Sequence, residues 1–322
     1  MTIDRQTFLG SLGAVALSGL PLAARAQAAK SITIGYVPST LFAPVFVAQE
    51  RGYLRDAGIT ANLTPIVAGQ DAMALVAQGQ IDAVAAGISA AFCNAINRNL
   101  EVKFVASTGY QPAKGHPSAL MIREDLYESG MHDASGLKGK KIGWLGNSGA
   151  TSGYYVARIL RKFGISIKDI DSVNIAAPDQ EVAFERKAVD AIFTAAPFTA
   201  LFEKKHVARI IGSIPAGISG TGIFFGPTLL HNLAAASAVM TALRRGAAEV
   251  AGKGYFADDN LAALSKYTGQ PVELIRTTDR YDFKPDLRID QATLQDMQAE
   301  YVSQGILAYK TPINDVRLVS RF

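Results

Sequence analysis

Glycines and hydroxyl-bearing residues gather where an apolar run gives way to a helical pattern. The richest such stretch is "GNSGATSG", at residues 146–153. A Gly-rich turn before a helix presents backbone N–H groups and the positive end of the helix dipole, which suits an anion or another polar acceptor. The stretch has no Walker-loop lysine, and Gly146, Gly149 and Gly153 do not match the dinucleotide fingerprint. It therefore predicts a cradle for a polar group without the machinery for a nucleotide.

Side chains typical of catalysis or metal binding show no comparable convergence. The four histidines have no metal-ligand spacing. The single cysteine, Cys93, follows Phe92 in a helical pattern and is expected to be a small buried apolar residue. Asp82 and Asp190 lie early in two strands, away from the predicted site, and are expected to be structural and not an acid/base pair. We therefore expect no catalytic residue, no metal and no cofactor.

The composition is that of a globular chain of one or two domains. Of the 322 residues, 49% are hydrophobic and 19% are charged. The formal net charge is only +4 and no Lys/Arg block occurs, so nucleic acid is not expected as a partner. We expect a monomer.

The N-terminal segment predicts export. Arg5 precedes an apolar run over residues 8–22 that ends in small-residue cleavage motifs, and residues 1–28 are predicted to be a cleaved signal peptide. Its apolar core is shorter than a spanning helix requires. "DRQTFLG" resembles the twin-arginine consensus except that Gln6 replaces the second arginine, which leaves the Sec route and a degenerate twin-arginine route open. The expected location is the periplasm.

An internal repeat organises the remaining chain. "IGYV" at residues 34–37 matches "IGWL" at 142–145, and "QIDAV" at 80–84 matches "AVDAI" at 188–192, each pair 108 residues apart. Each unit alternates strand and helix, which predicts an α/β fold with parallel-type sheets.

Gly/Pro-rich segments over 106–118 and 212–227 predict two crossings between lobes, with a hinge there. The expected lobes are residues 31–110 with 219–322, and residues 111–218. Helical patterns over 231–252, 258–268, 271–277 and 289–304 are assigned to the first lobe.

The repeat also predicts where a ligand lies. Ligands of open parallel sheets bind beyond the carboxyl ends of the strands, so two such lobes should form a cleft. The candidate binding residues of the first lobe are Ser39, Thr40, Leu41, Phe42, Gln70, Ser89 and Tyr110, and those of the second are Asn147, Ser148, Gly149, Thr151, Pro197 and Phe198.

Each of these residues has a competing structural interpretation. Hydroxyl residues at such junctions also act as helix N-caps, and Ser148 or Thr151 is the expected cap of the helix that begins near residue 151. Phe42, Phe198 and the rings at 224 and 225 could stack on a ligand or pack in a core. If Ser148 and Thr151 hold the polar end of a solute, replacing both with alanine should weaken binding at least about tenfold.

Several segments resemble one protein family. They are "VPSTLFAPVFVAQERGYLRDAGI", "VAGQDAMALVAQGQIDAVAAG", "LKGKKIGWLGNSGATSGYYVARIL", "AVDAIFTAAPF" and "YVSQGILAYKTPIND". Together they resemble the NMT1/THI5-like periplasmic solute-binding proteins of ABC importers, a group that binds sulfonates, taurine, nitrate and thiamine-pyrimidine precursors. The resemblance implies a two-lobed type II binding-protein fold and an ABC permease in the inner membrane as partner. It also implies that the lobes close over a small organic anion, a sulfonate or an aromatic or heterocyclic carboxylate.

One departure from the family pattern narrows the solute. Many relatives have an aromatic-acidic-Pro trio where this chain has Ala195-Ala196-Pro197. A carboxylate that could meet a cationic amine is therefore missing, which disfavours a taurine-like zwitterion.

Three alternative functions remain open. They are binding of a pyrimidine precursor, a pyrimidine-precursor synthase-like enzyme, and a ligand-sensing partner of a membrane receptor. The synthase is marked by a cysteine-rich iron motif that this chain lacks, so we do not expect an enzyme.

Overall fold

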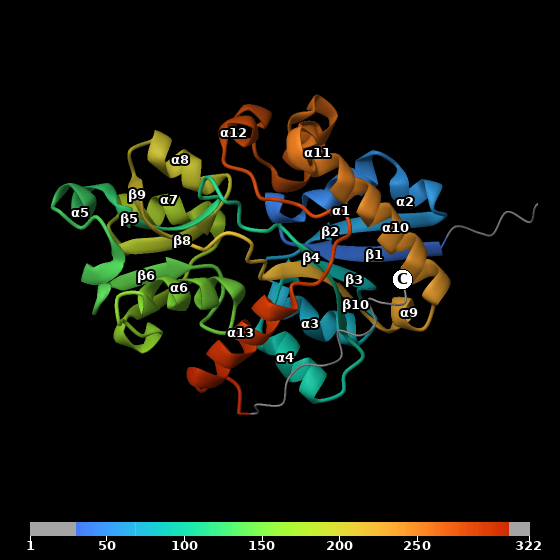
Figure 1. Cartoon of the computed structure of the whole chain (residues 1–322), viewed down its shortest axis with the longest axis horizontal. Coiled ribbons are helices and arrows are strands. Elements are labelled where there is room, and N and C mark those ends of the chain that lie inside the picture. The colour runs from blue at the N-terminus through green and yellow to red at the C-terminus, as the bar shows by residue number, and fades with distance from the viewer. Residues whose placement is uncertain (1–29, 68, 309–322) are drawn as a thin grey trace, which may run out of the picture.

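The chain builds two five-stranded sheets side by side, with helices on both faces of each (Figure 1). The computed structural model describes residues 30–67 and 69–308; the predicted signal peptide lies outside them. The first sheet has the order β2-β1-β3-β10-β4, from β1 (Lys30–Tyr36), β2 (Ile59–Pro65), β3 (Ala83–Gly87), β4 (Lys103–Thr108) and β10 (Thr221–Phe225). The second has the order β7-β6-β8-β5-β9, from β5 (Ser118–Arg123), β6 (Lys141–Trp144), β7 (Asp171–Asn174), β8 (Ala191–Ala195) and β9 (Ala208–Ser213).

Helices connect the strands within each sheet. In the first half they are η1 (Thr40–Phe42), α1 (Ala43–Glu50), α2 (Tyr53–Asp56), α3 (Gly69–Ala77) and α4 (Ala90–Asn97). Around the second sheet they are α5 (Glu124–Glu128), η2 (Ala134–Leu137), α6 (Thr151–Arg161), η3 (Ile167–Asp169), η4 (Ala177–Asp179), α7 (Gln180–Glu185) and α8 (Phe198–Lys204). The last part adds α9 (Pro227–Leu230), α10 (Leu233–Val250), η5 (Gly252–Phe256), α11 (Asp258–Thr268), α12 (Val272–Thr277) and α13 (Gln291–Ser303).

The pairing of the strands confirms the repeat. Ile34 of β1 lies opposite Ala83 of β3, and Ile142 of β6 lies opposite Ala191 of β8, which is the same pair shifted by 108 residues. The inner strands are buried along most of their length, as expected for sheets covered on both faces. The expected α/β architecture with two similar sheets is therefore correct.

Asp82 and Asp190 are structural, as expected. The Asp82 carboxylate accepts a hydrogen bond from the Thr33 backbone N–H at 2.8 Å, and the Asp190 carboxylate accepts one from the Lys141 N–H at 2.9 Å. Both bonds tie the start of the third strand of a unit to its first strand. The two bonds are equivalent under the repeat.

The sheets are mixed, and not purely parallel. β10 is antiparallel to β3 and β4, and β5 is antiparallel to β8 and β9. Each of these two strands begins where the chain has just crossed from the other sheet. It therefore enters its new sheet at the carboxyl edge of the parallel strands and must run in the opposite direction.

The C-terminal helices pack on two different surfaces. α10 and α11 pack beside α1 on the first sheet, in line with the sequence patterns. α13 was assigned to the first lobe, but it packs against both α4 and α6 and so touches both halves (Figure 1). Leu294, Met297 and Tyr301 of this helix are buried in an apolar cluster that contains residues of both sheets. The sequence pattern over 289–304 predicted a helix, but not which surfaces the helix would cover.

Candidate functional site

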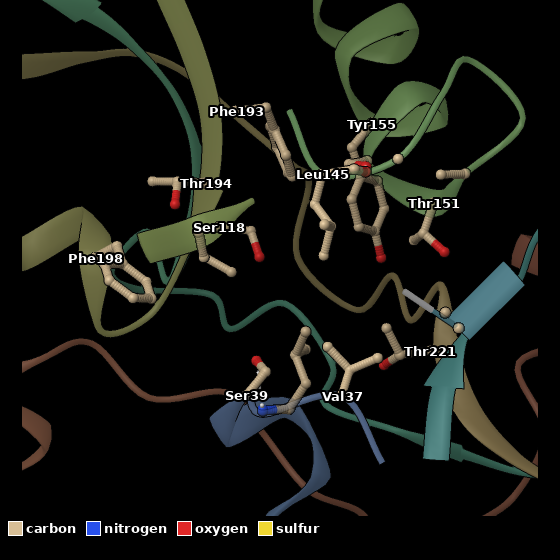
Figure 2. Close-up of a pocket in the computed structure, with 18 of the residues that line it drawn as sticks. Val37, Ser39, Ser118, Leu145, Thr151, Tyr155, Phe193, Thr194, Phe198 and Thr221 are labelled. Carbon is tan, nitrogen blue, oxygen red and sulfur yellow. Dashed lines mark hydrogen bonds between the residues drawn. The ribbon is translucent and has the colours of Figure 1, made fainter. Parts of the chain in front are cut away.

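A cavity of about 170 Å³ lies between the two sheets (Figure 2). It is bounded by the carboxyl ends of β1, β3, β6 and β8 and by the turns that follow them, where the repeat predicted a cleft. In Figure 2, Ser39 and Val37 of the first half face Leu145, Phe193 and Tyr155 of the second across this space. Both halves of the molecule therefore supply its walls.

The walls are apolar surfaces and hydroxyl groups. The apolar part of the lining includes Val37, Pro38, Leu41, Phe42, Leu145, Phe193 and Phe198. The polar part consists of Ser39, Ser89, Ser118, Thr151, Ser152, Tyr155, Gln180, Thr194 and Thr221. None of the lining residues that the structure describes carries a charge.

The two halves are in direct contact beside the cavity. Thr151, the first residue of α6, donates its hydroxyl to the carbonyl of Ile88 at 2.7 Å and also lies 3.2 Å from that of Gly220. The Ala90 N–H donates to the Gly149 carbonyl at 2.8 Å. The described arrangement is therefore a closed one, in which the start of α6 rests on the turn after β3.

Six of the candidate residues line the cavity. They are Ser39, Leu41, Phe42, Ser89, Thr151 and Phe198. Thr40, Tyr110, Asn147, Ser148, Gly149 and Pro197 lie elsewhere, and the side chain of Gln70 is outside the described part of the chain.

The candidates outside the cavity have structural contacts of their own. Tyr110 pairs with Asp282 in an isolated bridge and donates its hydroxyl to the Arg288 carbonyl at 2.6 Å. The Asn147 side chain accepts from the Gly149 N–H at 2.9 Å, within the turn. Thr40 is buried behind this surface.

The expected N-cap of α6 is corrected. Ala150 occupies the cap position and makes no side-chain hydrogen bond, whereas Thr151 is already helical. Ser39 and Ser89 are true N-caps, and they accept from the N–H groups of Leu41 and Phe92, both at 3.3 Å. Capping and cavity lining are therefore compatible for these two serines. Phe224 and Phe225 are core residues in β10.

Sequence reasoning missed the residues at strand starts. Ser118 begins β5 and Thr221 begins β10, and both line the cavity because these strands run against their neighbours. A hydroxyl directly after each crossing was the available signal. Phe193, Thr194 and Tyr155 were also missed, because they lie within a strand or a helix and not in a turn.

Tyr155 places a phenol in the cavity wall. Its hydroxyl accepts a hydrogen bond from the Gly220 N–H at 2.7 Å. Burial raises the pKa of Tyr155 against the lowering effect of that N–H, so the phenol remains protonated at neutral pH. In Figure 2 its hydroxyl points into the cavity.

The single cysteine, Cys93, does not line the cavity. Cys93 is fully buried in α4, as expected, and burial raises the pKa of its thiol to about 12. Within residues 30–67 and 69–308, no cluster of His, Cys, Asp and Glu is placed to hold a metal ion. No helix in this part of the chain is long and apolar enough to cross a membrane.

Comparisons with known proteins agree with this geometry. A sequence model described as "NMT1/THI5 like" matches residues 39–254. A comparison with curated proteins gives no match.

Among solved structures, the alkanesulfonate-binding protein SsuA of Xanthomonas axonopodis pv. citri, bound to MOPS, superimposes with a TM-score of 0.71 at 18% identity, over 88% of this chain and 96% of that one. The aliphatic sulphonate-binding protein SsuA of Escherichia coli gives 0.68 at 19% identity, over 89% and 91%. The nitrate-binding protein NrtA of Synechocystis PCC 6803 gives 0.71 at 13%, over 91% and 85%. The chain therefore has the fold of periplasmic binding proteins.

Proposed function

The chain belongs to the NMT1/THI5-like family, and from that premise we propose that it is the solute-binding component of an ABC importer. It captures a small organic solute between its lobes and delivers it to a permease in the inner membrane. We further propose that a signal peptide is cleaved from the chain, and that the mature protein is a periplasmic monomer that catalyses no reaction. Its lobes comprise residues 31–110 with 219–322, and residues 111–218, and the two crossings form the hinge.

The observation that carries this proposal is the cavity between the sheets. Both halves contribute walls, and Thr151 of one half reaches the Ile88 carbonyl of the other beside it. A solute in this space would contact both lobes at once, so its binding energy favours the closed arrangement. The alkanesulfonate- and nitrate-binding proteins have the same fold, which supports the importer role.

The lining also suggests how a solute is held. Phe42, Leu145, Phe193 and Phe198 provide apolar surface for a carbon framework. Oxygen atoms of a head group would be held by hydroxyl and N–H donors, since the described lining contains no cation. The first N–H groups of α6, at Thr151 and Ser152, are such donors. Sulfonates and ring carboxylates, the class expected from the sequence, are the first solutes to test.

The experiment combines native mass spectrometry with calorimetry. We expect protein purified without denaturation to carry one small molecule, and that molecule to bind with 1:1 stoichiometry and raise the melting temperature. Ala195→Leu adds bulk inside the cavity and should abolish binding, whereas Ala188→Leu, at an exposed position outside it, should not. Equal binding by both variants, or no solute that binds in any class tested, contradicts the proposal.

A further inference from the structure

We propose that the cavity takes a solute with an uncharged, amide-like head group, which offers a hydrogen-bond donor beside an acceptor, such as a carboxamide, a sulfonamide or a ring lactam. This inference rests on the proposed function and specifies its solute class. It follows from whether each hydroxyl in the wall already donates its proton to another protein atom or only accepts a hydrogen bond. In Figure 2, Ser118 and Thr194 lie on one side of the cavity and Tyr155 on another.

Ser118 can only accept from a solute. Tyr281 donates its single hydroxyl proton to the Pro117 carbonyl at 2.9 Å. Either oxygen could donate in the 2.8 Å contact between Ser118 and Tyr281, and because the Tyr281 proton is directed to Pro117, we assign the proton of this contact to Ser118. Gln111 donates to the same serine oxygen at 3.1 Å, which leaves that oxygen one further lone pair. A solute atom that binds here must be an N–H or O–H donor.

Thr194, like Ser118, requires a hydrogen-bond donor from the solute. Its hydroxyl donates to Oε1 of Gln180 at 2.6 Å, and the Gln180 amide nitrogen donates to the Ile175 carbonyl at 3.4 Å, which fixes the orientation of the amide. Thr194 is buried and lines the cavity, and its oxygen has lone pairs left to accept a hydrogen bond from a solute. Two adjacent hydroxyls therefore present lone pairs to a solute.

Donors occupy other parts of the wall. The oxygen of Tyr155 accepts from the Gly220 N–H, and those of Ser39 and Ser89 accept from helix N–H groups. The bonds that these three oxygens accept do not use their own protons, so the hydroxyls of Ser39 and Ser89 can donate to a solute, and that of Tyr155 can do so where the solute replaces its contact with Gln111. A carbonyl or sulfonyl oxygen fits this side.

The absence of charge in the described lining favours a neutral head group. A sulfonate or carboxylate offers hydrogen-bond acceptors only. Its oxygens would be repelled by the lone pairs of the Ser118 and Thr194 oxygens, which have no proton left to donate. No cationic side chain among the lining residues offsets the burial of its charge. An amide-like group of the same size satisfies both sides of the cavity without that cost.

The test uses matched pairs of solutes that differ in the head group. Calorimetry at neutral pH compares benzenesulfonamide with benzenesulfonate, and benzamide with benzoate. We expect the neutral member of each pair to bind at least about tenfold more tightly. Tighter or equal binding of the anion overturns the inference and leaves the importer role intact. Binding of neither member of either pair also overturns it, and the native mass spectrum then decides the importer role separately.

Two variants separate the donor and acceptor sides. Thr194→Val removes an acceptor and should weaken the neutral solutes about five- to tenfold without weakening the anions. Tyr155→Phe removes a donor that both kinds of head group use and should weaken both. Tyr53→Phe, on α2, is the matched control and should change neither. If Thr194→Val fails to fold, Ser118→Ala tests the same side; equal loss for neutral and anionic solutes in the acceptor variant contradicts the inference.

Discussion

At the scale of single residues, the two hydroxyls that the sequence placed in one cradle have different positions. Thr151 lines the cavity and bonds to the Ile88 carbonyl of the opposite half, whereas Ser148 lies outside it. Thr151→Val keeps the shape of the side chain and removes its donor. We expect it to destabilise closure by about 0.5–1.5 kcal/mol and to weaken solute binding by about two- to tenfold.

Ser148→Ala is the control for that variant and should bind with unchanged affinity in the same calorimetric titration. If Ser148→Ala loses as much affinity for the solute as Thr151→Val, then both Ser148 and Thr151 hold the polar end of the solute, as the sequence predicted.

The structural aspartates allow a stability prediction. Asp82→Ala leaves the Thr33 N–H without its carboxylate partner and should lower the free energy of unfolding by about 1–3 kcal/mol. Asp190→Ala should cost about as much, because it breaks the equivalent bond to Lys141. Urea unfolding followed by the fluorescence of Trp144, the single tryptophan, measures both. Asp71→Ala, at an exposed position in α3, is the control; an effect of either variant no larger than this control would contradict the prediction.

Six of the thirteen residues that the sequence predicted line the cavity. Ser39 and Ser89 could be predicted because they follow strands whose carboxyl ends meet at one edge, a rule that needs only the repeat. Tyr155 could not be predicted, since its spacing along α6 is also that of a core residue and only the position of Gly220 shows where its hydroxyl lies. Ser118 and Thr221 depend on strand direction, which the crossings set and the local pattern does not record.

At the scale of elements, the start of α5 carries a charge cluster that should make stability depend on pH. Hydrogen bonds from Arg123 and Lys187 hold the pKa of Asp125 at about 2, below its ordinary value of 3.8. A carboxyl with a lowered pKa stabilises the folded state above its ordinary pKa, and the contribution is lost as the pH falls towards 2.

We therefore expect Asp125→Asn to melt below the wild type at pH 5 and the difference to shrink as the pH approaches 2. The effect is modest because the side chain is 42% exposed. Melting curves across this range, with Asp71→Asn as the exposed control, measure it. A difference that grows on acidification would show that the sign is wrong.

The predicted elements were largely correct, and the failures have one cause. The pattern over 258–268 gave the bounds of α11, and 271–277 gave α12 to within one residue. Gly269 ends α11 in the left-handed conformation and Pro271 precedes α12, and both are boundary signals that the sequence carries. The local hydrophobic pattern does not predict the directions of β5 and β10 or the packing of α13 against both halves. These features depend on where the chain lies after each crossing.

At the scale of the whole molecule, closure requires a glycine at the end of β3. A Cβ atom at Gly87 would lie 2.2 Å from the Thr151 hydroxyl oxygen, so the halves could not reach the described contact. Gly87→Ala should therefore keep the fold, weaken solute binding by about tenfold or more and prevent the compaction that small-angle scattering detects when solute is added.

Two further variants make this test specific. Gly87→Ala combined with Thr151→Gly removes the clashing side chain and should restore compaction. Gly35→Ala, whose added Cβ would meet no atom closer than 3.4 Å, should behave as the wild type. Wild-type affinity in Gly87→Ala would mean that closure does not use this contact.

The order of the strands also has a consequence for how the chain acquires its fold. β10 lies between β3 and β4 in the first sheet, yet it is synthesised after every strand of the second sheet. Until residue 225 has left the ribosome, β3 and β4 have no common neighbour, and their facing edges offer unpaired backbone groups. The second sheet, by contrast, lies within one uninterrupted segment, residues 118–213, and can form before β10 is synthesised. A ribosome that stalls before β10 would thus release a finished half attached to an incomplete and aggregation-prone one.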